Sequence, residues 1–205
     1  MKRKWSVICS LLIFLLTMAA LAMMMTGFSF SGGPVMFSAE RIAAFRYFTV
    51  DSNVLMAVMA LTGAVFALRR PEAERPRWLV VLTYVATVAV SVTMCTVVFF
   101  LAPVMKRGFV RLFSDCNLFF HLIVPALSIL TLVCFGGSKE LKFKHTFLGL
   151  LPTAIYAVFY AVHVFGHLEQ GAVSPAYDWY GMCRFLEFIG LIVIDIVKII
   201  IFCVK

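Results

Sequence analysis

The chain has 205 residues, of which 63% are hydrophobic and 14% are charged, and its formal net charge is +8. A mean hydropathy of +1.01 lies far outside the composition of soluble globular domains and excludes soluble enzymes and soluble nucleic-acid-binding proteins. We therefore expect an integral membrane protein with no nucleic-acid partner.

Six apolar stretches are long enough to cross a hydrocarbon core of ~30 Å, which takes roughly 20 helical residues. They cover residues 5–26, 46–68, 78–101, 112–135, 147–167 and 182–203. A transmembrane barrel would instead show alternating segments of about ten residues. Because the connections are short, the sequence predicts an all-α fold, with six transmembrane helices bundled in a single domain over residues 1–205.

The first stretch resembles a secretory signal, because three basic residues precede it and Ala20-Leu21-Ala22 resembles a cleavage site. Its apolar run is longer than a typical signal core, so we expect a retained first helix.

Basic residues are unevenly distributed between the two sets of alternating connections, and cytoplasmic connections carry the excess. One set, with both termini, holds Lys2, Arg3, Lys4, Arg69, Arg70, Arg75, Arg77, Lys139, Lys142, Lys144 and Lys205. The other set holds Arg41, Arg46, Lys106, Arg107, Arg111 and Arg184. This asymmetry predicts that both termini are cytoplasmic and that the first, third and fifth connections lie outside.

The second and fourth stretches carry polar residues near their predicted outer ends. Residues four apart on a helix share a face, which pairs Thr49 with Asn53 and Asn117 with His121. Cys116 lies about 140° from His121 around the helix axis.

The fifth and sixth stretches place further polar residues at the same outer level. These are Tyr156, Tyr160, His163 and His167 on the fifth, and Arg184 and Glu187 on the sixth. Ionisable groups inside a bilayer are costly, face the bundle interior and mark function. The four stretches together predict a shared polar pocket in the outer half of the bundle.

Each of these residues also has an ordinary structural interpretation. A threonine in a membrane helix commonly bonds back to the carbonyl four residues earlier, and a histidine can join two helices by a hydrogen bond. No spacing typical of zinc ligands occurs, so we expect no metal and no cofactor. The six cysteines are scattered and predict buried thiols. Cys116 and Cys183 lie near the outer ends of their helices, where a disulfide is geometrically open but has no further support. Pro125 and Pro152 fall inside stretches, where each frees a backbone carbonyl that a neighbour must satisfy.

Three short motifs resemble the androgen-induced family of membrane hydrolases, which includes the androgen-dependent regulators of tissue-factor-pathway inhibitor, and in particular its bacterial-type relatives. They are Phe48-Thr49, Asn117-x-x-x-His121 followed by Pro125, and Tyr160-x-x-His163-x-x-Gly166. The resemblance covers most of the chain in the number and order of spans. The sequence departs from the family pattern in two places. The acidic residue that follows the threonine in the family is shifted here to Asp51, and the stretch around His163 has one histidine where animal members often have two adjacent.

The resemblance implies a six-span hydrolase of fatty acid esters of hydroxy fatty acids, with Thr49 as nucleophile and His121 as base. In that mechanism Asn53 and Asn117 lie on the correct faces to stabilise the oxyanion. His163 or Glu187 would orient the base, with Tyr160 and Arg184 lining the pocket. The partner is then a lipid or fatty-acyl ester, in the plasma membrane of a bacterium or in an endomembrane or plasma membrane of a eukaryote.

Three alternatives remain open at this point. The first is an acyltransferase or thioesterase that uses Cys116 with His121. The second is a small-ligand transporter or receptor that uses the same pocket without chemistry. The third is a structural membrane protein whose outer pocket is filled by side chains.

Overall fold

The structure is a computed structural model of the 205-residue chain. It describes residues 2–33, 35–104, 109–136, 141–143, 145–169, 172–174 and 176–180. The sixth predicted span, residues 182–203, lies outside the described residues.

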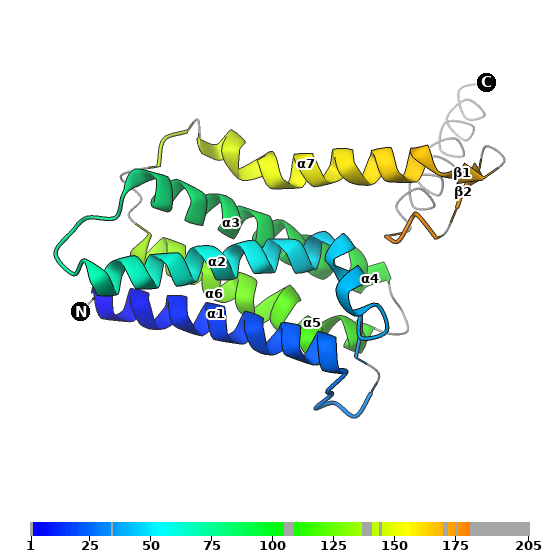
Figure 1. The fold of residues 1–205 in the computed structure, drawn as a ribbon, viewed down its shortest axis with the longest axis horizontal. Coiled ribbons are helices and arrows are strands. Elements are labelled where there is room, and N and C mark those ends of the chain that lie inside the picture. The colour runs from blue at the N-terminus through cyan, green and yellow to red at the C-terminus, as the bar shows by residue number, and fades with distance from the viewer. Residues whose placement is uncertain are drawn as a thin grey trace, which may run out of the picture. The chain divides into compact units, whose positions relative to one another are not determined.

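The described chain is mostly helical (Figure 1). In chain order, its elements are α1 (Lys2–Thr26), η1 (Arg41–Arg46), α2 (Phe48–Arg69), α3 (Arg77–Cys95), η2 (Thr96–Leu101), α4 (Ala102–Val104), η3 (Phe109–Phe113), α5 (Cys116–Leu118), η4 (Phe119–Ile123), α6 (Val124–Phe135), α7 (His145–Gly166), β1 (Leu168–Glu169) and β2 (Ala172–Val173). The elements η1 and η3 are 3₁₀ turns, whereas η2 and η4 are π-helical turns within longer helices.

Five helical runs are long and apolar enough to cross a membrane. They are Lys2–Thr26, Phe48–Arg69, Arg77–Leu101, Cys116–Phe135 and His145–Gly166. They overlap the first five predicted stretches, so the prediction of a mostly helical, multi-pass class is confirmed.

The predicted start of the fourth span at residue 112 is wrong. Asp115 has a φ of 52°, a left-handed value that a continuous helix cannot contain. The chain therefore forms the separate 3₁₀ turn η3 first, and the long helix begins only at Cys116. Because of this break, Asn117 and His121 lie in the first turns of the long helix, which begins at Cys116.

The chain divides into two compact units, Met1–Ala154 and Ile155–Lys205. In the first unit, α1 packs against α2 and α6, and α3 packs against the same two helices (Figure 1). Small side chains allow α2 to approach its neighbours closely, and those that are buried on it include Ala57, Ala60, Ala64 and Ala67. The result is a four-helix arrangement in which α2 carries the most buried side chains.

The second unit contains the last turns of α7 and a short antiparallel hairpin. Its strands β1 and β2 pair Leu168 with Val173 and Glu169 with Ala172. Aromatic side chains on α7 contact those that follow the hairpin, with Tyr160 and Trp179 ring centroids 5.0 Å apart.

Asp115 fastens the first connection to the start of the fourth span. Its buried carboxylate accepts hydrogen bonds from the backbone N–H groups of Phe30 (2.8 Å) and Ser31 (3.1 Å), and from the hydroxyls of Ser29 (3.1 Å) and Ser31. Burial opposes ionisation, but these four donors outweigh it and lower the pKa of Asp115 below its ordinary value. The carboxylate thus holds residues 29–31 against α5.

This clamp predicts a pH-dependent stability difference between the wild type and Asp115→Asn. A folded-state pKa below the unfolded value, roughly 3.9, stabilises the fold above that value, and this stabilisation is lost as the pH falls through the folded pKa. We expect Asp115→Asn to cost about 1–3 kcal/mol near neutral pH, with the gap closing in acid. Thermal unfolding in detergent across pH measures it.

Asp51→Asn is the matched control, because Asp51 is exposed. An equal loss in that variant, or a gap for Asp115→Asn that does not change with pH, would contradict the clamp.

Candidate functional site

A buried amide connects the second and fourth spans. The Asn53 side chain is 0% exposed, and its Nδ2 donates to the carbonyl of Thr49 (2.8 Å) and to the carbonyl of Phe120 (3.1 Å). The first acceptor lies one turn earlier on α2, and the second lies in the π-helical turn η4. One side chain therefore fixes the separation of the two backbones that carry Thr49 and His121.

Pro125 explains why Phe120 needs a donor from another helix. In η4 the hydrogen bonds run to the residue five positions earlier, as the N–H of Val124 does to the carbonyl of Phe119. The next bond in this series would run from residue 125 to Phe120, but proline has no N–H. Asn53 supplies the missing donor, which confirms the prediction that a neighbour satisfies the carbonyl freed by Pro125.

His121 lies in the middle of η4 and is held in one tautomer. Its ring is 4% exposed, and Nδ1 lies 2.7 Å from the carbonyl oxygen of Leu112. A carbonyl only accepts, so Nδ1 carries the proton and Nε2 of the neutral imidazole keeps a lone pair. Within the described residues, Nε2 makes no hydrogen bond. His121 thus presents an unused base.

Asn117 holds the same segment as His121. Its Nδ2 donates to the carbonyl of Arg111 (3.0 Å) and to the sulfur of Met36 (2.8 Å). Arg111 and Leu112 are consecutive in η3, so Asn117 and His121 bind adjacent carbonyls, in agreement with their predicted common face.

Thr49 differs from most hydroxyl residues in these helices. The hydroxyls of Thr17, Thr62 and Thr83, for example, donate to the carbonyl four residues earlier. Thr49 lies in the first turn of α2, and residue 45, four positions earlier, belongs to η1. The Thr49 side chain is 7% exposed, and its hydroxyl makes no hydrogen bond within the part of the chain that the structure describes. Thr49 therefore does not make the back-bond to the carbonyl four residues earlier that would explain a threonine in a membrane helix.

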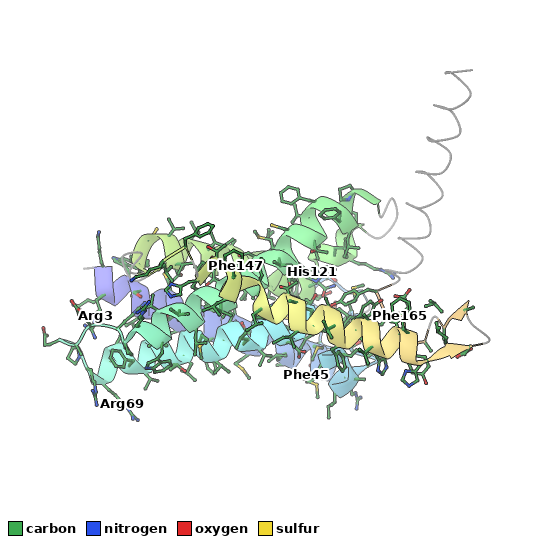
Figure 2. The ribbon with its side chains drawn as sticks, turned by 90° about the horizontal axis from the view of Figure 1, so that it is seen from above. Arg3, Phe45, Arg69, His121, Phe147 and Phe165 are labelled. Carbon is green, nitrogen blue, oxygen red and sulfur yellow. The ribbon has the colours of Figure 1, made fainter. Side chains whose placement is uncertain are left out.

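The predicted pair thus lies at one end of the first unit. Figure 2 shows His121 and Phe45 in the half of the bundle away from Arg3 and Arg69. Asn53 binds the carbonyls of Thr49 and of Phe120, the residue before His121. In the described chain, however, no hydrogen bond joins the Thr49 hydroxyl directly to the His121 imidazole.

The amide N–H groups of Asn53 and Asn117 are already engaged by carbonyl and sulfur acceptors. In this arrangement they are not free to stabilise an oxyanion, and both residues position backbone instead. The Oδ1 atom of Asn53 is buried and has no hydrogen-bond partner among the described residues. Exchanging its oxygen and nitrogen would face the oxygen towards two carbonyls, so the orientation is fixed.

Cys116 belongs to the core. Its side chain is fully buried beside Ala20, Met24 and Phe120, and its thiol donates to the carbonyl of Met36 at 3.5 Å. It is a free thiol, whereas Cys183 lies outside the described residues. The geometry gives Cys116 a packing role and does not favour it as a nucleophile.

The predicted accessory residues fall in the second unit or outside the described chain. Tyr160 donates a short hydrogen bond to Asp178, and the His163 ring lies 5.2 Å from that of Trp179. Neighbouring rings among the four residues named on the fifth span contact each other within this unit, Tyr156 with Tyr160 and His163 with His167. Arg184 and Glu187 lie outside the described residues.

The described residues contain no group of three His, Cys, Asp or Glu side chains that could hold a metal ion. Comparison with known proteins adds no identification, since no family model, curated protein or solved structure matches the chain.

Three features of the site were not predicted from the sequence. The Asp115 clamp binds serines of the first connection, and no local pattern links residues 29–31 with residue 115. Ser52 lies 3.1 Å from the hydroxyl of Thr93 and joins α2 to α3, but a single serine in a membrane helix carries no such signal. The π-helical turn η4 had one available indication, the proline that follows it.

The compensation between Asn53 and Pro125 can be tested with a double-mutant cycle. Asn53→Leu leaves the carbonyl of Phe120 without a donor, at a cost of about 1–3 kcal/mol. Ala at position 125 supplies an N–H, so we expect Asn53→Leu to cost about 1 kcal/mol less in the Pro125→Ala background. Thermal or denaturant unfolding in detergent measures the four proteins.

Ser52→Ala, made in the same two backgrounds, is the control, because the Ser52 hydroxyl bonds to Thr49 and Thr93 and not to the carbonyl of Phe120. Equal costs of Asn53→Leu with proline or alanine at position 125 would show that Asn53 does not replace the proline's missing N–H.

Proposed function

We propose that the protein is an integral membrane hydrolase that cleaves lipid esters, with Thr49 as nucleophile and His121 as general base. The observation that carries the proposal is the unbonded Thr49 hydroxyl at the same end of the bundle as a histidine whose tautomer leaves Nε2 free. Because the Thr49 hydroxyl makes no hydrogen bond within the described chain, it is available to act as a nucleophile.

The histidine geometry supports a role as base. In activated nucleophile systems, a base removes the hydroxyl proton, and a third group orients the base. The Leu112 carbonyl has that orienting role here, since it binds Nδ1–H at 2.7 Å. This assignment replaces His163 or Glu187 as the orienting group and needs no residue from the second unit.

In the proposed reaction, Nε2 of His121 takes the Thr49 hydroxyl proton as the oxygen attacks the ester carbonyl carbon. The bond between that carbon and the alkoxy oxygen then breaks, and His121 returns the proton to the leaving alcohol. Water, deprotonated by the same imidazole, attacks the acyl-threonine and releases the carboxylic acid and Thr49.

Asn53 and Asn117 act in this proposal as positioning residues. Asn53 fixes the separation of the Thr49 and Phe120 backbones, and Asn117 holds the segment whose Leu112 carbonyl orients the base. A loss of about 1 Å in such positioning can reduce turnover by about 10²-fold.

The lipid substrate follows from the surroundings. The site lies within helices that are long and apolar enough to cross a membrane, and many large apolar side chains on them are exposed. Acyl chains would reach the site from the bilayer and water from its outer end. We further propose that the chain crosses the membrane six times and that both termini are cytoplasmic. We also propose that it belongs to the androgen-induced family and that its substrates are fatty acid esters of hydroxy fatty acids.

Activity-based labelling tests the assignment. We expect a fluorophosphonate probe to label the purified wild type on Thr49, and Thr49→Ala to abolish both labelling and ester hydrolysis. His121→Gln removes the base, so turnover should fall by about 10²–10⁴-fold. Mass spectrometry of the labelled peptide identifies the modified residue.

Thr62→Ala is the matched control, because the Thr62 hydroxyl, on the same helix, bonds to the Val58 carbonyl. Retained labelling in a folded Thr49→Ala variant would reject the nucleophile. An adduct on Cys116 would instead favour the cysteine mechanism, and no adduct on any residue would favour a ligand-binding protein.

A further inference from the structure

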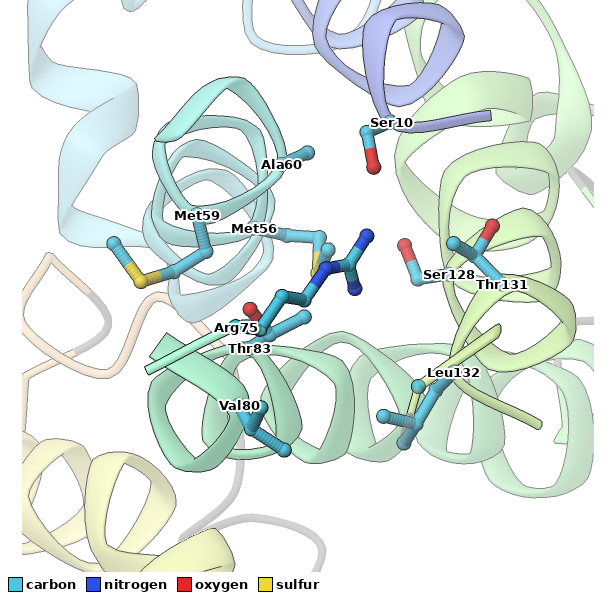
Figure 3. A pocket seen from close by; sticks show the side chains of 11 residues that line it. Ser10, Met56, Met59, Ala60, Arg75, Val80, Thr83, Ser128, Thr131 and Leu132 are labelled. Carbon is cyan, nitrogen blue, oxygen red and sulfur yellow. The ribbon is translucent and has the colours of Figure 1, made fainter. Parts of the chain in front are cut away.

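A second polar site lies at the opposite end of the first unit, around Arg75. Arg75 belongs to the connection between α2 and α3, yet its side chain points inward between the helices (Figure 3). The cavity that it enters is lined by the hydroxyl residues Ser10, Thr83, Ser128 and Thr131, and by apolar residues that include Met56 and Ala60.

Among the described residues, no aspartate or glutamate forms an ion pair with Arg75. Its Nη2 donates to the hydroxyl of Ser6, and this is its one hydrogen bond within the described residues. None of the described residues that line the cavity is an aspartate or a glutamate. A guanidinium carries five N–H donors and stays charged, so the remaining donors of Arg75 have no partner among the described residues.

Arg3 provides a contrast at the same end of the bundle. Its guanidinium donates to the carbonyls of Ala67 (3.1 Å), Arg70 and Ala73 (3.3 Å), where α2 ends. A helix C-terminus attracts positive charge, so Arg3 is satisfied by the protein itself. Arg75 has no such set of carbonyl partners among the described residues. Its burial and the nearby charge of Arg3 both lower the pKa of Arg75.

The hydroxyls around the cavity differ in what they can offer a ligand. Those of Thr83, Ser128 and Thr131 donate their protons to carbonyls of their own helices. The hydroxyl of Ser10 makes no hydrogen bond in the described part of the chain, and Figure 3 shows it directed towards the Arg75 guanidinium. Ser10 can therefore donate a proton to a ligand that Arg75 attracts.

We propose that Arg75 and Ser10 bind a phosphate group at this end of the bundle. A guanidinium binds phosphate oxygens through two parallel N–H donors. The cavity has room for roughly one water-sized group, so one phosphate oxygen enters beside the guanidinium, a second accepts its parallel N–H at the cavity rim, and the rest of the molecule stays outside. A phospholipid headgroup and free inorganic phosphate share this chemistry.

The site is independent of the proposed hydrolase, because it lies at the other end of the helices and contains none of its residues. An anion here would neutralise the charge that α1, α2, α3 and α6 surround. Phosphate binding would therefore stabilise the bundle without participating in ester cleavage.

Thermal unfolding of the purified full chain in an uncharged maltoside detergent tests the proposal. Inorganic phosphate is compared with chloride at equal ionic strength, and micelles that contain phosphatidic acid are compared with micelles that lack it. We expect one or both phosphate sources to raise the wild-type Tm by several degrees, since a ligand that binds only the folded state stabilises it. Stabilisation by phosphatidic acid alone identifies a lipid headgroup, whereas stabilisation by inorganic phosphate identifies a site open to the free ion.

Arg75→Gln should abolish the stabilisation, and Arg75→Lys should weaken phosphate affinity by about tenfold because a lysine lacks the paired donors. Arg69→Gln is the matched control, since it removes the same charge from an exposed residue at the same end of the bundle. Ser10→Ala tests the site if Arg75→Gln fails to fold, with an expected loss of several-fold in affinity.

Two results would overturn the proposal. One is that neither phosphate source stabilises the wild type beyond the chloride or lipid control. The other is that Arg69→Gln reduces the stabilisation as much as Arg75→Gln or Ser10→Ala does, which would indicate diffuse surface charge.

Discussion

The arrangement of this site depends on a single missing hydrogen-bond donor. Inside hydrocarbon, every backbone carbonyl needs a partner from the protein, because water is absent. Pro125 cannot donate to the π-helical turn that precedes it, and the Asn53 amide on another helix donates to the carbonyl of Phe120 instead. The same amide binds the carbonyl of Thr49, so meeting this backbone requirement also places the second span against the fourth.

That connection brings together residues whose side-chain chemistry is otherwise unused. His121 commits one ring nitrogen to Leu112 and keeps the other free, and the Thr49 hydroxyl lacks the back-bond that most other threonines here make. The polar groups around them are nearly all occupied by structural hydrogen bonds. The proposed hydrolysis therefore uses only the threonine and the histidine, and the asparagines position the backbone around them.

The two ends of the first unit handle charge in different ways. At the Asp115 end, a buried carboxylate is satisfied by four donors from residues 29–31. At the other end, Arg3 donates to carbonyls where α2 ends, whereas Arg75 extends into a cavity whose described lining contains hydroxyl residues and no acid. Since an unpaired charge among helices is costly, and no described residue neutralises Arg75, the proposed phosphate would supply its counter-charge.

Continuous apolar runs determined the class of the protein and the first five helices, because crossing a hydrocarbon core needs a fixed length of apolar helix. The spacing of Thr49 with Asn53 and of Asn117 with His121 likewise placed each pair on one helix face, since helical phase is a local property. Three things depended on tertiary structure: the start of the fourth helix at Cys116, the donor that satisfies Phe120, and the use of the asparagine amides by structural acceptors. Each depends on a contact between residues that are distant in the chain, such as Asp115 with Ser31 or Asn53 with Phe120, and no local pattern encodes such a contact.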